Sequence, residues 1–108
     1  MGDADAAAGG SGESAGTIAI FAEYDALPGI GHGCGQNVMC ANSVGAFLAL
    51  AALARSHPGA LPGRVVLQTT PVEENSTAKE ILAVRGMLDG VGATIQTHSY
   101  AHDVTHQT

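Results

Sequence analysis

The chain has 108 residues, of which 45% are hydrophobic, and its formal net charge is -6 with Lys and Arg together numbering 4. That length gives room for one domain with one modest core. Nucleic-acid binding needs clustered basic side chains to neutralise phosphates, so this charge argues against it. We expect no apolar run of membrane-spanning length, no signal peptide and no disulfide framework. These features predict a cytoplasmic protein of one domain, with no nucleic-acid or membrane partner.

The first segment, residues 1–16, consists mainly of Ala, Gly, Ser and acidic residues without apolar periodicity. Such a segment buries too little surface to offset the entropy of ordering it. We therefore predict a disordered N-terminal tail over residues 1–16 and a domain over residues 17–108.

Strand and helix patterns alternate through the rest of the chain. Residues 17–24, 64–70 and 91–97 are short, β-branched or apolar runs that predict strands. Between the first two strands, Val44 to Ala54 carries no polar side chain, which predicts a helix that begins near Asn37 as N-cap and is buried on every side. A second helix is expected from a Ser76 or Thr77 cap to Arg85, because Gly86 follows as a stop signal.

This alternation predicts an α/β fold with a parallel or mixed sheet and helices packed on it. Three groups of candidate ligands directly follow predicted strands, namely the loop around Cys34, the pair Glu73 and Glu74, and His98. Open parallel sheets bind ligands at the carboxyl ends of their strands. We therefore expect these side chains to meet at one edge of the sheet.

The loop AEYDALPGIGHGCGQN, residues 22–37, places His32, Cys34 and Gln36 at alternating positions. If the loop is extended, the three side chains point to one side. Thiolate and imidazole are preferred zinc ligands, so the pattern fits a zinc site. A Cys and a His in a turn without metal fit it as well. Asp25 can orient a ligand from behind or can cap the turn.

Adjacent acids such as Glu73 and Glu74 are not expected to point the same way. One can bind a metal while its neighbour accepts a proton, which is the equipment for hydrolysing an amide with a metal-bound water. An acidic pair that opens a helix can also simply favour the helix dipole.

Three ordered motifs, AEYDALPGIGHGCGQN, TTPVEEN and DGVGATIQTHS, carry a family resemblance from about Thr17 to Tyr100. They resemble the first half of the catalytic domain of metallopeptidase family 20, in the amidohydrolase branch with aminoacylase-like, p-aminobenzoyl-glutamate hydrolase and Xaa-Arg dipeptidase types. The resemblance implies a mixed sheet between helices and two zinc ions. It also implies a substrate that is a small dipeptide or an N-acyl amino acid.

By the same resemblance, Glu73 is the general base, and Cys34, Glu74 and His98 are metal ligands. From their place in or near the loop, and not from the resemblance, Asp25 and His32 are candidates to support the ligands from outside the metal's own shell. The family forms homodimers through a smaller domain that follows this region, which residues 17–108 lack.

The chain departs from the family pattern in two places that bear on the site. Gln36 occupies the position of a metal-binding His, and an amide oxygen is a poor zinc donor. Asn75, Ser76 and Thr77 replace a Gly-rich run. The expected function is therefore a zinc-dependent amide hydrolase present as a fragment, and the alternative is a non-catalytic remnant with a degraded metal site.

Overall fold

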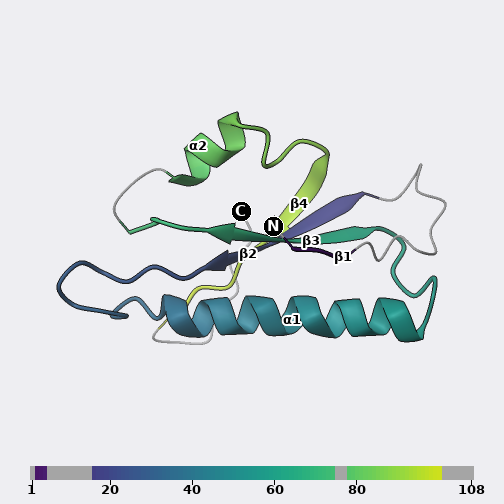
Figure 1. The fold of residues 1–108 in the computed structure, drawn as a ribbon, viewed down its shortest axis with the longest axis horizontal. Helices are drawn as coiled ribbons and strands as arrows, with labels where there is room; N and C mark the ends of the chain where they lie inside the picture. The colour runs from purple at the N-terminus through teal and green to yellow at the C-terminus, as the bar shows by residue number, and fades with distance from the viewer. Residues whose placement is uncertain (1, 5–15, 75–77, 101–108) are drawn as a thin grey trace.

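A computed structural model describes residues 2–4, 16–74 and 78–100 of the chain. The described elements are four strands and two helices: β1 (Gly2–Ala4), β2 (Thr17–Glu23), α1 (Gln36–Ser56), β3 (Arg64–Thr70), α2 (Ala78–Val84) and β4 (Val91–Ile95) (Figure 1).

The strands form one sheet in the order β1-β3-β2-β4. β2 runs parallel to β3, from the pair Thr17 and Arg64 to the pair Glu23 and Thr70, and parallel to β4 on its other side. β1 pairs antiparallel with β3. The prediction of an α/β fold with three parallel strands is confirmed, and β1 makes the sheet mixed.

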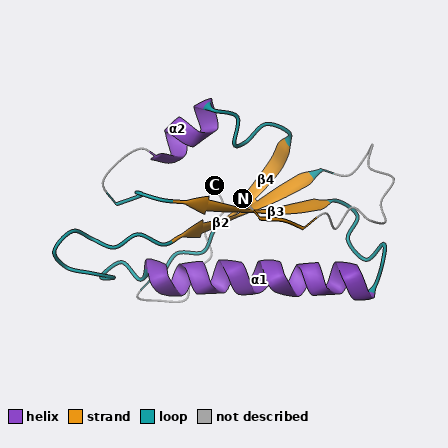
Figure 2. Ribbon diagram, viewed as in Figure 1, coloured by secondary structure: helices purple, strands orange, loops and turns teal. Residues whose placement is uncertain are grey.

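The two helices lie on opposite faces of the sheet, as Figures 1 and 2 show. The strand order explains this arrangement: the chain goes from β2 through α1 to β3, and then returns past β2 through α2 to β4. Right-handed connections in opposite directions place their helices on opposite faces. The neighbouring strands β2 and β3 therefore send the chain to opposite faces, which is the arrangement at whose carboxyl end open α/β sheets bind ligands.

Side chains of β2 alternate between two small cores, one on each face. On the α1 face the core contains Ile20, Phe47 and Val65. On the opposite face it contains Ala19, Phe21 and Val66, with Met87 and Val91 packed against it. These cores hold the carboxyl ends of β2 and β3 side by side.

The prediction that α1 is buried on every side is wrong. Its buried residues form a single stripe along the face toward the sheet, made of Gln36, Met39, Ser43, Phe47 and Ala51. Leu48, on another face of the helix, is 58% exposed. Sheet packing covers only one side of a helix, and no other described element covers the rest of α1.

The start of α1 also differs from the expectation. The helix begins at Gln36, with Gly35 rather than Asn37 at the N-cap. By length and composition alone α1 is apolar enough to cross a membrane, a test that core helices of soluble proteins also pass. The expectation that no apolar segment reaches that length is therefore wrong on this criterion.

Gly2–Ala4 form a strand, so the expectation of a tail without regular structure is wrong for these residues. β1 pairs with the outer edge of β3 through backbone N–H and C=O groups, and pairing of this kind needs no apolar side chains. The rest of that prediction, for residues 1 and 5–15, lies outside the described residues, as do the Ser76 and Thr77 caps.

Candidate active site at the carboxyl edge of the sheet

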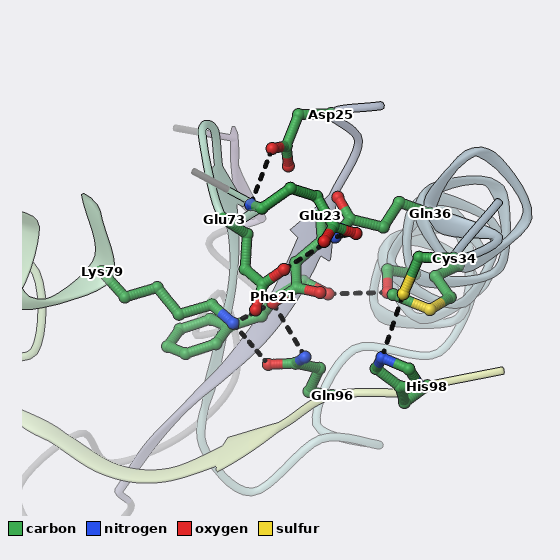
Figure 3. A network of polar contacts seen from close by, with 12 residues as sticks. Phe21, Glu23, Asp25, Cys34, Gln36, Glu73, Lys79, Gln96 and His98 are labelled. Atoms are coloured by element: carbon green, nitrogen blue, oxygen red, sulfur yellow. Dashed lines mark hydrogen bonds and ion pairs between the residues drawn. The ribbon is translucent and has the colours of Figure 1, made fainter. Parts of the chain in front are cut away.

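Three segments that are distant in sequence meet at the carboxyl edge of the sheet. They are the loop and first turn after β2, the turn after β3 and the segment after β4 (Figure 3). Five predicted site residues form three hydrogen-bond contacts there: Cys34 contacts His98, and Gln36 contacts both Glu73 and Glu74. The expected meeting at one edge agrees with this arrangement, while the chemical roles of the residues stay predictions.

Gln36 contacts both acids of the pair. Its side-chain Nε2 donates to Glu73 Oε2 at 2.9 Å and to Glu74 Oε1 at 2.8 Å. The side chain is 0% exposed, because Gln36 is the first residue of α1 and faces the sheet. Both carboxylates therefore reach one nitrogen atom, and the expectation that the two acids point in different directions is wrong.

The backbone before the acids explains how both reach Gln36. Val72 has a φ of 58°, which is the left-handed region. A β-branched residue adopts this region rarely and at a cost of about 1–3 kcal/mol. The turn over Val72 replaces the extended backbone that would point successive side chains to opposite sides, so Glu73 and Glu74 both approach the start of α1.

Cys34 and His98 form the second contact of the site, and they point toward one another in Figure 3. The Sγ atom of Cys34 lies 3.5 Å from Nε2 of His98. His98 Nδ1 is 2.7 Å from the backbone oxygen of Ser99, which fixes the orientation of the ring.

Gly35 allows the Cys34 loop and the segment after β4 to approach closely. Its φ is 81°, and a Cβ atom there would lie 2.8 Å from Ser99 Oγ. Ser99 Oγ donates to the backbone oxygen of Cys34, and its N–H donates to Met39 Sδ at 3.2 Å. Ser99 thus links the His98 segment to the first turn of α1, a role that the sequence analysis missed.

The two residues expected to support the ligands behave differently. Asp25 Oδ2 accepts the backbone N–H of Glu74 at 2.9 Å, so Asp25 holds the turn that carries the acids. His32 is exposed in a bend, whereas Gln36 is buried at the start of α1. The expectation of an extended loop with His32, Cys34 and Gln36 on one side is wrong, because the loop turns and α1 has begun at Gln36.

A second polar network lies at the same edge and was not predicted. Glu23, the last residue of β2, is 2% exposed and pairs with Lys79 of α2. Gln96 Nε2 donates to the same Glu23 oxygen at 2.9 Å, and Lys79 Nζ donates to Gln96 Oε1 at 3.2 Å. The sequence held the signal: Ala19, Phe21 and Glu23 share one face of a buried strand, and Lys79 is the one lysine of the sequence.

The thiol of Cys34 is held in its protonated form. The hydrogen bond to the Glu74 carboxylate raises the pKa of Cys34, and burial and the negative charges of Glu74, Glu73 and Asp25 raise this pKa further. These acids favour a neutral thiol for as long as no cation offsets their charge.

Zinc fits part of this donor set. A tetrahedral zinc ion holds a thiolate sulfur and an imidazole nitrogen about 3.5 Å apart, and Cys34 Sγ and His98 Nε2 are 3.5 Å apart. The Glu74 carboxylate, the third expected ligand, instead accepts the Gln36 amide. Within residues 2–4, 16–74 and 78–100, no group of three or more His, Cys, Asp or Glu is arranged to hold a metal ion. The structure therefore offers a pair of soft donors, while Gln36 holds the carboxylate.

Comparison with known proteins gives two similar sequences. The chain is 35% identical over 81 residues to a Xaa-Arg dipeptidase of Mus musculus. It is 36% identical over 85 residues to a Xaa-Arg dipeptidase of Homo sapiens. Each match covers 75% of this chain and 19% of the relative, so the chain spans about a fifth of the length of these proteins. No protein-family model matches the chain.

Proposed function

We propose that the chain belongs to metallopeptidase family 20 and carries part of the active site of a hydrolase that cleaves the amide bond of dipeptides. The observation that carries the proposal is the contact of Glu73 and Glu74 with the start of α1, beside the pair of Cys34 and His98. The similarity to proteins named Xaa-Arg dipeptidase supports it and selects dipeptides that end in Arg as the first substrates to try.

Glu73 is the proposed proton acceptor. Its side chain is exposed, so that water and substrate can reach it, and the Gln36 amide holds its Oε2 atom in place. A carboxylate in this position takes a proton from the attacking water and passes it to the leaving amine. Asp25 holds the backbone of Glu74 and thereby fixes the turn on which Glu73 lies.

Cys34, His98 and Glu74 are the residues that would hold zinc. When bound, zinc supplies a Lewis acid that polarises the amide carbonyl and lowers the pKa of water. The separation of the Cys34 and His98 donor atoms supports this assignment, and loading requires that Cys34 lose its proton and that Glu74 leave Gln36.

Because the chain carries only part of the active site, we expect it to be weak or inactive alone, and the test places it in a full-length relative in exchange for the matching segment. The measurement is hydrolysis of dipeptides that end in Arg in the presence of zinc, with N-acetyl amino acids as the comparison substrates. We expect Glu73→Gln to lower turnover roughly a hundredfold to ten-thousandfold, because the amide cannot accept the proton. Zinc content should stay unchanged. Glu80→Gln, an exposed acid on α2, is the matched control and should keep full turnover.

Two results would contradict the proposal in different ways. Normal turnover by a zinc-loaded Glu73→Gln chain would show that the role assigned to Glu73 is wrong. No hydrolysis of either substrate class by a full-length relative in which this chain replaces the matching segment, with zinc shown to be bound, would show that the proposed activity is wrong.

A further inference from the structure

The orientation of the Gln36 amide is informative because two carboxylates share its nitrogen. Both Glu73 Oε2 and Glu74 Oε1 accept from Nε2, while Oε1 of Gln36 is buried and has no hydrogen-bond partner among the described residues. Rotating the amide by half a turn would place a third oxygen against the two carboxylates. The partial negative charge of the amide oxygen would be repelled by the two carboxylates unless a cation lay between them.

The Gln36 amide therefore takes the position that a cation would take between these acids. An NH₂ group carries two hydrogens, each with a partial positive charge, and it can satisfy one oxygen of each acid. Hydrogen bonds to charged acceptors are stronger than those between neutral groups. In addition, the Gln36 side chain is fully buried at the start of α1, so it has little room to move away from the two carboxylates.

We propose that Gln36 acts as a neutral clamp on Glu73 and Glu74 that competes with metal ions for Glu74, and that metal binding here requires the Gln36 amide to release Glu74. Gln36 is thus a competitor of the metal ion, and not only a weak ligand in the place of a strong one. A weak ligand contributes little and its removal changes little, whereas a competitor lowers metal affinity for as long as it is present.

These two views of Gln36 make opposite predictions for one variant. Gln36→Leu keeps a side chain of similar size and removes both the donors and the oxygen. If Gln36 is only a poor donor, this variant binds zinc no better than the natural chain. If Gln36 is a clamp, the variant frees two carboxylates and binds zinc more tightly, by roughly tenfold to a hundredfold, as expected for lost hydrogen bonds to charged groups.

The experiment is a zinc titration of the 108-residue chain against a competing chelator. It compares the natural chain, Gln36→Leu, Gln36→His and the control Gln68→Leu, whose amide bonds only to a neighbouring backbone oxygen in the described contacts. Circular dichroism checks the fold of each variant. Gln36→Ala, which leaves room for water beside the acids, is the second variant in case Leu prevents folding, and the same direction of change is expected.

Tighter binding by Gln36→Leu or Gln36→Ala, lost again when Cys34→Ser is added and absent from Gln68→Leu, would support the clamp. Equal or weaker binding by these variants would overturn it, even if Gln36→His binds more tightly. Tighter binding that survives Cys34→Ser would also overturn it, because the ion would lie elsewhere. The proposal rests on the zinc site proposed above but not on hydrolysis. A full-length relative carrying this chain that binds zinc as predicted and cleaves nothing would therefore contradict the proposed function alone.

Discussion

Two acidic networks lie at the carboxyl edge of the sheet, and they differ in what offsets their charge. Glu23, buried at the end of β2, pairs with the ammonium group of Lys79 and with Gln96. Glu73 and Glu74, in the turn after β3, share the neutral amide of Gln36 among the described residues. The Lys79 ammonium group offsets the charge of Glu23, whereas the neutral Gln36 amide leaves the negative charges of Glu73 and Glu74 in place.

This difference separates a network that stabilises the fold from one that is available to react or to bind a ligand. The paired Glu23 joins β2 to α2 and the end of β4, and the Glu23 charge is already offset. The exposed Glu73 retains a charge that water, a metal ion or a substrate can use. This contrast supports the proposal that Glu73 and Glu74 carry the chemistry, while Glu23 and Lys79 position the strands that hold them.

The largest expected effect comes from removing the cation of the first network. Lys79→Met leaves Glu23 buried without its ion-pair partner, which costs about 3 kcal/mol, at the low end for a buried pair because Lys79 itself is partly exposed. The measurement is urea unfolding of the chain. Arg85→Met, which removes an exposed cation next to α2, should cost less than about 0.5 kcal/mol.

Adding Glu23→Gln to Lys79→Met sharpens the comparison, because it removes the uncompensated charge. The double variant should recover part of the lost free energy of unfolding. If Lys79→Met were as stable as Arg85→Met, the ion pair would not hold α2 to the sheet.

A smaller effect is expected at Cys34, whose pKa is raised chiefly by the Glu74 carboxylate. Glu74→Gln removes this carboxylate, so the pKa falls toward the ordinary thiol value and more thiolate forms at a given pH. Thiolate is the reactive species, and one pKa unit changes its fraction up to tenfold. We expect alkylation of Cys34 at pH about 8, with a chelator present, to become several-fold faster, as followed by mass spectrometry.

The pH dependence gives the control for this prediction. A thiol whose pKa is higher in the folded chain than in the unfolded chain stabilises the fold below the unfolded pKa, and this contribution is lost as pH rises through the folded pKa. Because Glu74→Gln lowers the pKa of Cys34, the rate of Cys34 alkylation should rise at a lower pH in this variant. The same pH profile should stay unchanged in Glu80→Gln. An unchanged or slower reaction in Glu74→Gln would show that Glu74 does not control the thiol.

The sheet could be predicted from the sequence because its signals are local. β2, β3 and β4 are apolar runs bounded by turn residues, and their alternation with helices fixes parallel pairing. The antiparallel β1 carries no such signal, since backbone pairing at the edge of β3 does not depend on its side chains. The single buried stripe of α1 was missed for a related reason, because composition does not tell how many neighbours a helix has.

The site could be predicted as a set of residues but not as a set of contacts. The positions of Cys34, Glu73, Glu74 and His98 after strands follow from topology. The shared contact of both acids with Gln36 depends on the left-handed turn at Val72, and a Val in a loop gives no sign of this conformation. The Gln36 side chain was expected in an extended loop, whereas the early start of α1 turns it toward the acids.

The side-chain amide of Gln36 offers the most direct test of the central claim, that a neutral amide holds both Glu73 and Glu74. In the metal-free chain, nuclear magnetic resonance should show its two NH₂ protons at shifted positions and in slow exchange with water, because both hydrogens are bonded and buried. The amide of Gln68 gives the internal comparison. Gln36 signals that coincide with those of a solvent-exposed amide and exchange as fast would contradict the account.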